Sequence, residues 1–168
     1  MFPFFNFGSR CCCCRCKPPK ADNAAYGGKW LVYNGVPIDI AVPGGNYTVP
    51  LDQLLPSHNV GSGIDSLVIE TGGDYDVTWA LNVVPGVTAR LAAAVAVNGS
   101  VQSQSEMINT AAQQFVEQKL GASTILRLAA GDVVTLVVTS DVAVELFPYT
   151  TSTASLLVKR LGEGGLAA

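Results

Sequence analysis

From residue 30 onward the chain is a succession of short apolar segments separated by turns rich in glycine, proline and asparagine. Asn-Gly and Gly-Asp pairs in these turns reach the positive φ angles that tight hairpins need. Short strands at a spacing of roughly 8–12 residues are typical of a β-sandwich or barrel. The sequence therefore predicts an all-β fold. The predicted strands are 30–33, 36–42, 47–51, 67–71, 75–84, 88–97, 115–120, 124–128, 133–139, 142–147 and 154–160.

The residues within these strands predict which faces are buried. The strand at 75–84 alternates, so one face carries Val77, Trp79, Leu81 and Val83, and the other carries Asp76, Thr78, Ala80 and Asn82. Segments 91–97 and 133–138 are apolar or small on both sides. This pattern favours a second layer that covers the outer face of these strands, such as another copy of the chain. Segment 106–120 has a partly helical pattern, but a loop followed by a strand is the preferred interpretation.

The composition narrows the function. Only 14% of the residues are charged, against about a quarter in typical soluble domains, which points to an oligomer. The net charge of −3 argues against a nucleic-acid binder, and no apolar run is long enough for a membrane helix. His58 is the only histidine and lies in a turn-rich loop. With one histidine, the sequence indicates neither a Ser-His-Asp arrangement nor a His-rich metal site. Glu70, Asp74 and Asp76 are interpreted as edge charges rather than a Ca²⁺ site. We therefore expect no enzyme, cofactor or metal ion.

The first residues differ sharply from the rest. Residues 1–20 contain four basic residues and no acid, a charge of +4, so the remainder carries −7 to give the total of −3. Pro18 and Pro19 favour an extended connection. The segment lacks the basic start and uninterrupted apolar stretch of a signal peptide, so we expect it to be retained. The predicted organisation is an N-terminal connector at 1–29, a β head at 30–162 and a short tail at 163–168.

All the cysteines lie in the connector: Cys11, Cys12, Cys13, Cys14 and Cys16. A disulfide scaffold distributes its cysteines so that bridges close loops within the domain. Sequence neighbours rarely bridge each other without strain, so intermolecular disulfides are the preferred interpretation. Metal binding, S-acylation and an inert reduced segment are the alternatives.

Four phenylalanines precede the cysteines: Phe2, Phe4, Phe5 and Phe7. Each aromatic ring buries about 150–250 Å² when it docks. At ~25 cal/mol per Å², docking two rings contributes several kcal/mol before ordering costs. We interpret these residues as a docking peptide for a neighbouring assembly; packing on the chain's own head is the alternative.

Four segments of the head resemble the globular heads of tumour necrosis factor and complement-type proteins. They are 70–79, with a Gly-Gly turn before an aromatic strand, 94–99, ending in Asn-Gly, 126–136, with its Gly-Asp turn, and the closing strand 154–159. In the residue pattern of its strands the chain most resembles the C-terminal head of the collagen-like exosporium glycoprotein of Bacillus spores. Unlike that protein, this chain has no Gly-X-Y repeat before its head. The resemblance implies a jelly-roll sandwich of about ten strands that forms a tight homotrimer.

The connector resembles the N-terminal connector peptides of spore appendage fibres, in which one subunit docks on the next. The two resemblances together imply a structural subunit of a self-assembling, disulfide-stabilised fibre on the spore surface, in the exosporium or an appendage. The partners implied are other copies of the chain and a spore-surface anchor protein. The alternative is a trimeric adhesin or receptor-binding head that the cysteine-rich segment anchors.

Overall fold

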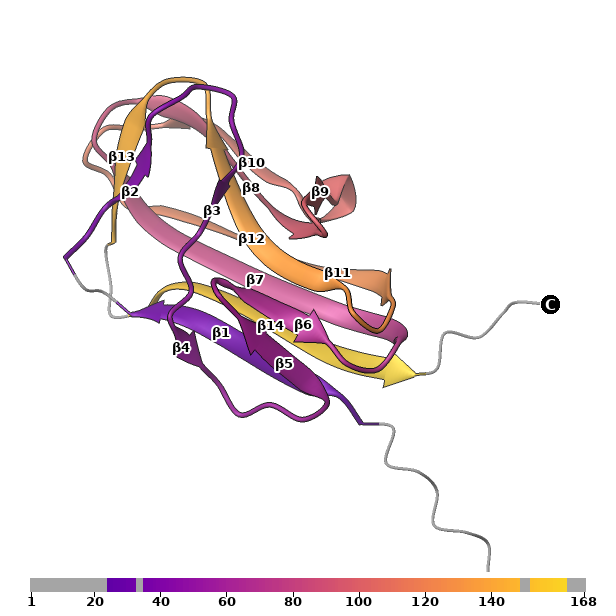
Figure 1. Ribbon diagram of the computed structural model, residues 1–168. Helices are drawn as coiled ribbons and strands as arrows, with labels where there is room; N and C mark the ends of the chain where they lie inside the picture. Colours follow the sequence, from indigo (N-terminus) through magenta and orange to yellow (C-terminus); the bar gives the residue numbers. More distant parts are fainter. Residues whose placement is uncertain (1–23, 33–34, 149–151, 163–168) are drawn as a thin grey trace, which may run out of the picture.

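The computed structural model describes residues 24–32, 35–148 and 152–162. These residues form two antiparallel sheets packed face to face, so the all-β prediction is confirmed and the architecture is a β-sandwich (Figure 1). The described ranges contain no α-helix, only the 3-10 turn η1 (Ser103–Ser105). Segment 106–120 holds a strand, a turn and the start of a second strand, so the helical alternative is wrong, and a strand stands at 107–112 where a loop was predicted.

The first sheet, sheet A, has β7 as its longest strand. On one side β7 pairs with β11, and on the other it pairs first with β14 and then with β13. β1 and β4 continue the sheet beyond β14, and β2 continues it beyond β13. The strands of sheet A are β1 (Tyr26–Val32), β2 (Ile38–Ile40), β4 (Gln53–Leu54), β7 (Gly73–Pro85), β11 (Gln118–Leu128), β13 (Val144–Pro148) and β14 (Ser152–Gly162).

The second sheet, sheet B, is ordered β10-β8-β12-β6-β5, with β9 beside β8 and β3 beside β12. Its strands are β3 (Tyr47–Thr48), β5 (Val60–Gly63), β6 (Ser66–Ile69), β8 (Ala89–Val97), β9 (Ser100–Val101), β10 (Met107–Ala112) and β12 (Val133–Ser140). Strands β4, β5, β9 and β10 lie outside the predicted apolar runs. β1 begins at Tyr26, four residues before the predicted run at 30–33.

The core lies between the sheets, and β7 is its centre. Its alternation is confirmed, because Val77, Trp79, Leu81 and Val83 are all buried while their neighbours on the other face are only partly covered. The indole N–H of Trp79 donates to the Ser105 carbonyl at 3.0 Å. The Ser105 hydroxyl accepts from the Val95 N–H at 2.9 Å and donates to the Gln102 carbonyl at 2.7 Å. This chain of bonds satisfies the polar groups in the core beside η1.

Strands β8 and β12 correct one expectation from the sequence. Their outward-facing residues Ala94, Ala96 and Val137 form a second buried cluster within the single chain. Each is small or flanked by cross-strand neighbours, such as Val101 opposite Ala96, so little of its surface reaches solvent. These three residues in the middle of sheet B are therefore covered within the single chain.

Candidate interaction surfaces

The predicted site residues lie outside the described part of the chain. They are Cys11, Cys12, Cys13, Cys14 and Cys16, and Phe2, Phe4, Phe5 and Phe7. What the structure does describe is the head to which the connector is joined, beginning at β1. The surfaces described below are therefore those of the head.

Four neighbouring strands of sheet A, β1, β14, β7 and β11, share a continuous outer face. Register places the outward residues of β1, β14, β7 and β11 in rows across the sheet. The two middle rows contain no charged side chain. They are Gly28, Leu157, Thr78 and Ser123, and then Trp30, Ser155, Ala80 and Gly121. We call these two rows the central face.

Polar groups of the central face are bonded within the sheet. The Thr78 hydroxyl donates to the Ser123 hydroxyl oxygen at 3.1 Å, and the Ser123 hydroxyl donates to a carboxylate oxygen of Asp76 at 2.6 Å. The carboxylate at the edge of the face is thereby bonded rather than left for a ligand. What remains outward is small, weakly polar or apolar, and Leu157 keeps 40% of its surface exposed.

A groove of about 470 Å³ lies at one side of this face. Its floor is Gly28, whose missing side chain makes the space, since a Cβ there would approach Leu157 Cδ2 to 2.4 Å and Leu55 Cδ1 to 3.0 Å. Leu55 and Pro56 form one wall, and β14 forms the other. The groove is mainly apolar, and it continues the central face toward the edge of the sheet.

His58 lies beside this groove. Its ring stacks on Tyr26 with the centroids 6.0 Å apart, and the backbones of the two residues exchange hydrogen bonds of 3.0 and 2.8 Å. The sequence indicated a solvated loop histidine; the ring is exposed, but it belongs to a small bridge that fixes the start of β1. Within the described ranges no three His, Cys, Asp or Glu side chains are grouped to hold a metal ion.

A second hollow, of about 450 Å³, lies near the turn between β6 and β7 and contains two arginines. Arg127 forms a bidentate pair with Asp74, at 2.9 and 3.2 Å, and this hydrogen bonding lowers the pKa of Asp74 and raises that of Arg127. The Arg160 Nε donates to the Gly72 carbonyl at 3.0 Å. Both guanidinium groups are engaged with the chain, so this cluster holds the turn in place. Asp74 is the edge charge that the sequence indicated.

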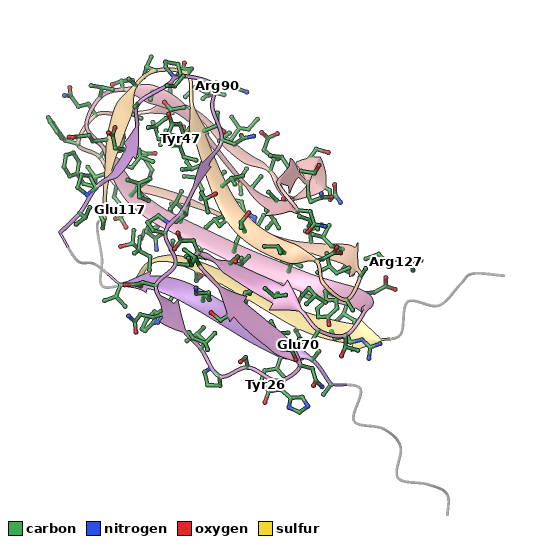
Figure 2. All side chains as sticks on the ribbon, in the orientation of Figure 1. Tyr26, Tyr47, Glu70, Arg90, Glu117 and Arg127 are labelled. Atoms are coloured by element: carbon green, nitrogen blue, oxygen red, sulfur yellow. The ribbon has the colours of Figure 1, made fainter. Side chains whose placement is uncertain are left out.

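The end of the head farthest from Tyr26 is formed by loops 86–88, 113–117 and 141–143 together with the paired strands β2 and β13, and we call this end the tip. Figure 2 shows Tyr26 at one end of the molecule and Arg90 and Glu117 at the other. Phe115 in the tip has a φ of 57° and a side chain that is 71% exposed. Its N–H donates to the Pro85 carbonyl at 2.9 Å. A non-glycine residue in the left-handed region is strained, and here that strain presents an aromatic ring to solvent.

Two substitutions at position 115 separate the ring from the backbone strain. Phe115→Gly and Phe115→Ala both remove the ring, but only glycine accepts a φ of 57° without a steric penalty. We therefore expect the glycine variant to be more stable than the alanine variant by about 1 kcal/mol. Urea denaturation of both variants measures the difference. Equal stabilities, or a more stable alanine variant, would show that the position is not strained.

The comparisons with protein families and with curated proteins assign no role to these surfaces. No protein-family model matches the chain, and no curated protein matches it. Across the described ranges, none of the elements is a helix of the length and apolar character required to pass through a bilayer.

Proposed function

We propose that the chain is the structural subunit of a self-assembling, disulfide-stabilised fibre. In this proposal the heads are jelly rolls that associate as homotrimers through the outer face of sheet A. N-terminal connectors then join successive trimers, and the connector cysteines lock the joint. The fibre belongs to a bacterial surface, and the resemblance of the head to an exosporium protein favours that of a spore.

The strand order supports the jelly roll. Along the chain, the main strands β1, β6, β7, β8, β10, β11, β12 and β14 are distributed over the two sheets as β1-β14-β7-β11 and β6-β12-β8-β10. The first and last main strands are therefore neighbours in one sheet, and the second and the last but one are neighbours in the other. This nested pairing is what two Greek keys produce when a sandwich is wound as a jelly roll.

The uncharged central face is the main observation that supports a homotrimer. Charged residues are depleted in the cores of protein interfaces, and eight adjacent outward positions without a charge are a suitable core. The groove at Gly28 and the edge strand β11 lie on opposite sides of this face. Contact between two different surfaces of identical chains generates a closed ring when the rotation closes. Three copies around one axis are such a ring.

A charge placed on the central face tests the trimer. Ala80→Arg puts a long cation at the middle of the face, where burial without a partner is strongly unfavourable, so we expect monomers in place of trimers. Light scattering coupled to size-exclusion chromatography measures the mass. Ala92→Arg is the matched control, because Ala92 is also a half-buried alanine but lies on the outer face of sheet B. Dissociation by the control, or trimers that survive Ala80→Arg, would contradict the assignment of the face.

The fibre itself is tested by electron microscopy of the purified protein. Because the described head contains no cysteine and all five lie in the connector, covalent links between copies must pass through connector residues. We expect long filaments in negative stain without reductant, and short filaments or separate trimers after reduction. Single trimers under both conditions would contradict the fibre.

A further inference from the structure

The tip contains an uncompensated pair of acids. Asp39 in β2 and Glu145 in β13 lie directly opposite each other in an antiparallel pair, and both are exposed. Like charges in this arrangement destabilise a sheet. Among the described residues the ion pairs are Lys119–Glu117 and Arg127–Asp74, so within those ranges neither Asp39 nor Glu145 has a cationic partner. Such an arrangement is suited to a cation supplied from outside the head.

The acids border a hollow with apolar walls. Its volume is about 300 Å³, and Val87, Ala143 and Val144 line it together with Gly86. Gly86 is fixed by a hydrogen bond from its N–H to the Glu145 carbonyl at 2.8 Å. Exposed apolar side chains surround the hollow or lie on the adjoining loops of the tip: Val87, Phe115, Val116, Val142 and Phe147. The tip therefore combines negative charge with an apolar and aromatic surface.

We propose that the tip is the seat for the N-terminal segment of a neighbouring copy. This inference rests on the fibre proposed above and names the surface that receives the connector. Phe2, Phe4, Phe5 and Phe7 supply rings for the apolar surface. Arg10, Arg15 and Lys17 supply the cations that Asp39 and Glu145 lack. The basic segment, at +4 without an acid, complements the tip in both charge and hydrophobicity, and such complementarity selects partners and orients them.

The tip and the start of the described chain lie at opposite ends of the head. In register, Tyr26 lies in the row of Asp76, and Pro85 is nine residues further along β7. At about 3.3 Å per residue the two ends are roughly 30 Å apart. The described chain thus begins at the end opposite the tip (Figure 1). A contact that joins one end of a subunit to the opposite end of the next is heterologous and open, which produces a filament.

An introduced cysteine tests the seat in the full chain. The described head has no cysteine, so Val87→Cys can form a disulfide only with connector cysteines or with its own kind. We expect mass spectrometry of non-reduced digests to find position 87 linked to the segment 11–16. The yield should exceed by about tenfold that of Val133→Cys, because docking raises the local concentration of the connector. Val133 is a matched control, being 36% exposed against 42% for Val87 but at the opposite end of the head.

Isotope labelling shows which copy supplies the connector. A copy with Val87→Cys and its five connector cysteines changed to serine is mixed with ¹⁵N-labelled wild-type protein under reducing conditions, and the mixture is then oxidised. We expect position 87 of the light copy to be linked to the heavy connector. Equal linkage at positions 87 and 133 would overturn the seat. In the Val87→Cys copy that retains its connector cysteines, position 87 could instead be linked only to the connector of the same chain. That result would overturn the inference that a neighbouring copy supplies the connector.

A charge exchange tests the same contact without new cysteines. Asp39→Lys with Glu145→Lys retains a like-charged pair, so the stability of the head should change little, but filaments should be lost. Adding Arg10→Glu, Arg15→Glu and Lys17→Glu to the same chain should restore them. Filaments that persist after the first exchange would show that the connector docks elsewhere, and they would leave the fibre proposal uncontradicted. Absence of filaments from the unmodified protein would instead contradict the fibre itself.

Discussion

Deletion of residues 1–20 is expected to abolish both filaments and disulfide-linked multimers while leaving folded trimers. The deletion removes all five cysteines and the four phenylalanines of the docking peptide, whereas every strand of the described sandwich begins after it. Negative-stain microscopy and denaturing gels run with and without reductant measure the loss. Circular dichroism checks that the β-sandwich of the truncated protein is intact.

A full-length variant separates the two parts of the connector. With all five cysteines changed to serine, the disulfide-linked multimers should disappear from non-reducing gels. Filaments should still form at high protein concentration, because the phenylalanines remain. Filaments formed by the truncated protein would contradict the role of the connector. Unchanged assembly, with the protein merely released from its surface, would favour the adhesin.

Trp79→Ala is expected to lower the free energy of unfolding by about 3–5 kcal/mol. Trp79 is 1% exposed and is the largest of the fully buried side chains in the described core. Typical domains are stable by only about 5–15 kcal/mol, so the variant should be marginally folded at best. Chemical denaturation followed by circular dichroism measures the loss.

Two further variants identify the source of that loss. Trp79→Phe keeps a ring in the core but leaves the Ser105 carbonyl without its indole donor, so about 1–3 kcal/mol should be lost. Tyr26→Ala is the control, since Tyr26 is an aromatic residue that is 47% exposed at the start of β1 and belongs neither to the core nor to the central face. A loss at Tyr26 equal to that at Trp79 would show that the core has been misassigned.

The fold class could be predicted because local signals carry it. Turn pairs such as Asn98-Gly99 punctuate the strands, and Asn98 does adopt the positive φ that such a turn needs. The alternation along β7 identified its buried face for the same reason, since side-chain direction in a strand depends only on sequence parity. Strands such as β4 and β9 escaped prediction because each has two residues, too few for any period.

The surfaces could not be predicted because they are assembled across strands. The central face exists only through the register that places Ala80 between Ser155 and Gly121. The opposition of Asp39 and Glu145 depends on the pairing of β2 with β13, which are more than a hundred residues apart. The strand predicted at 115–120 fails at its start because Phe115 turns the chain, and no residue type at that position signals a positive φ. The predicted connector residues lie outside the described ranges, so their part in the site stays a prediction.

The pairing of β1 with β14 has a mechanical consequence for a fibre of this kind. If each subunit is pulled at its connector and held at its tip, tension enters at Tyr26 and runs along β1. The seven residue pairs that join β1 to β14 then lie across the direction of pull, so their hydrogen bonds are loaded together in shear. A strand loaded from its side would instead peel off one bond at a time. The pairing of β1 with β14 therefore resists tension along this axis better than a strand that could be peeled away one bond at a time.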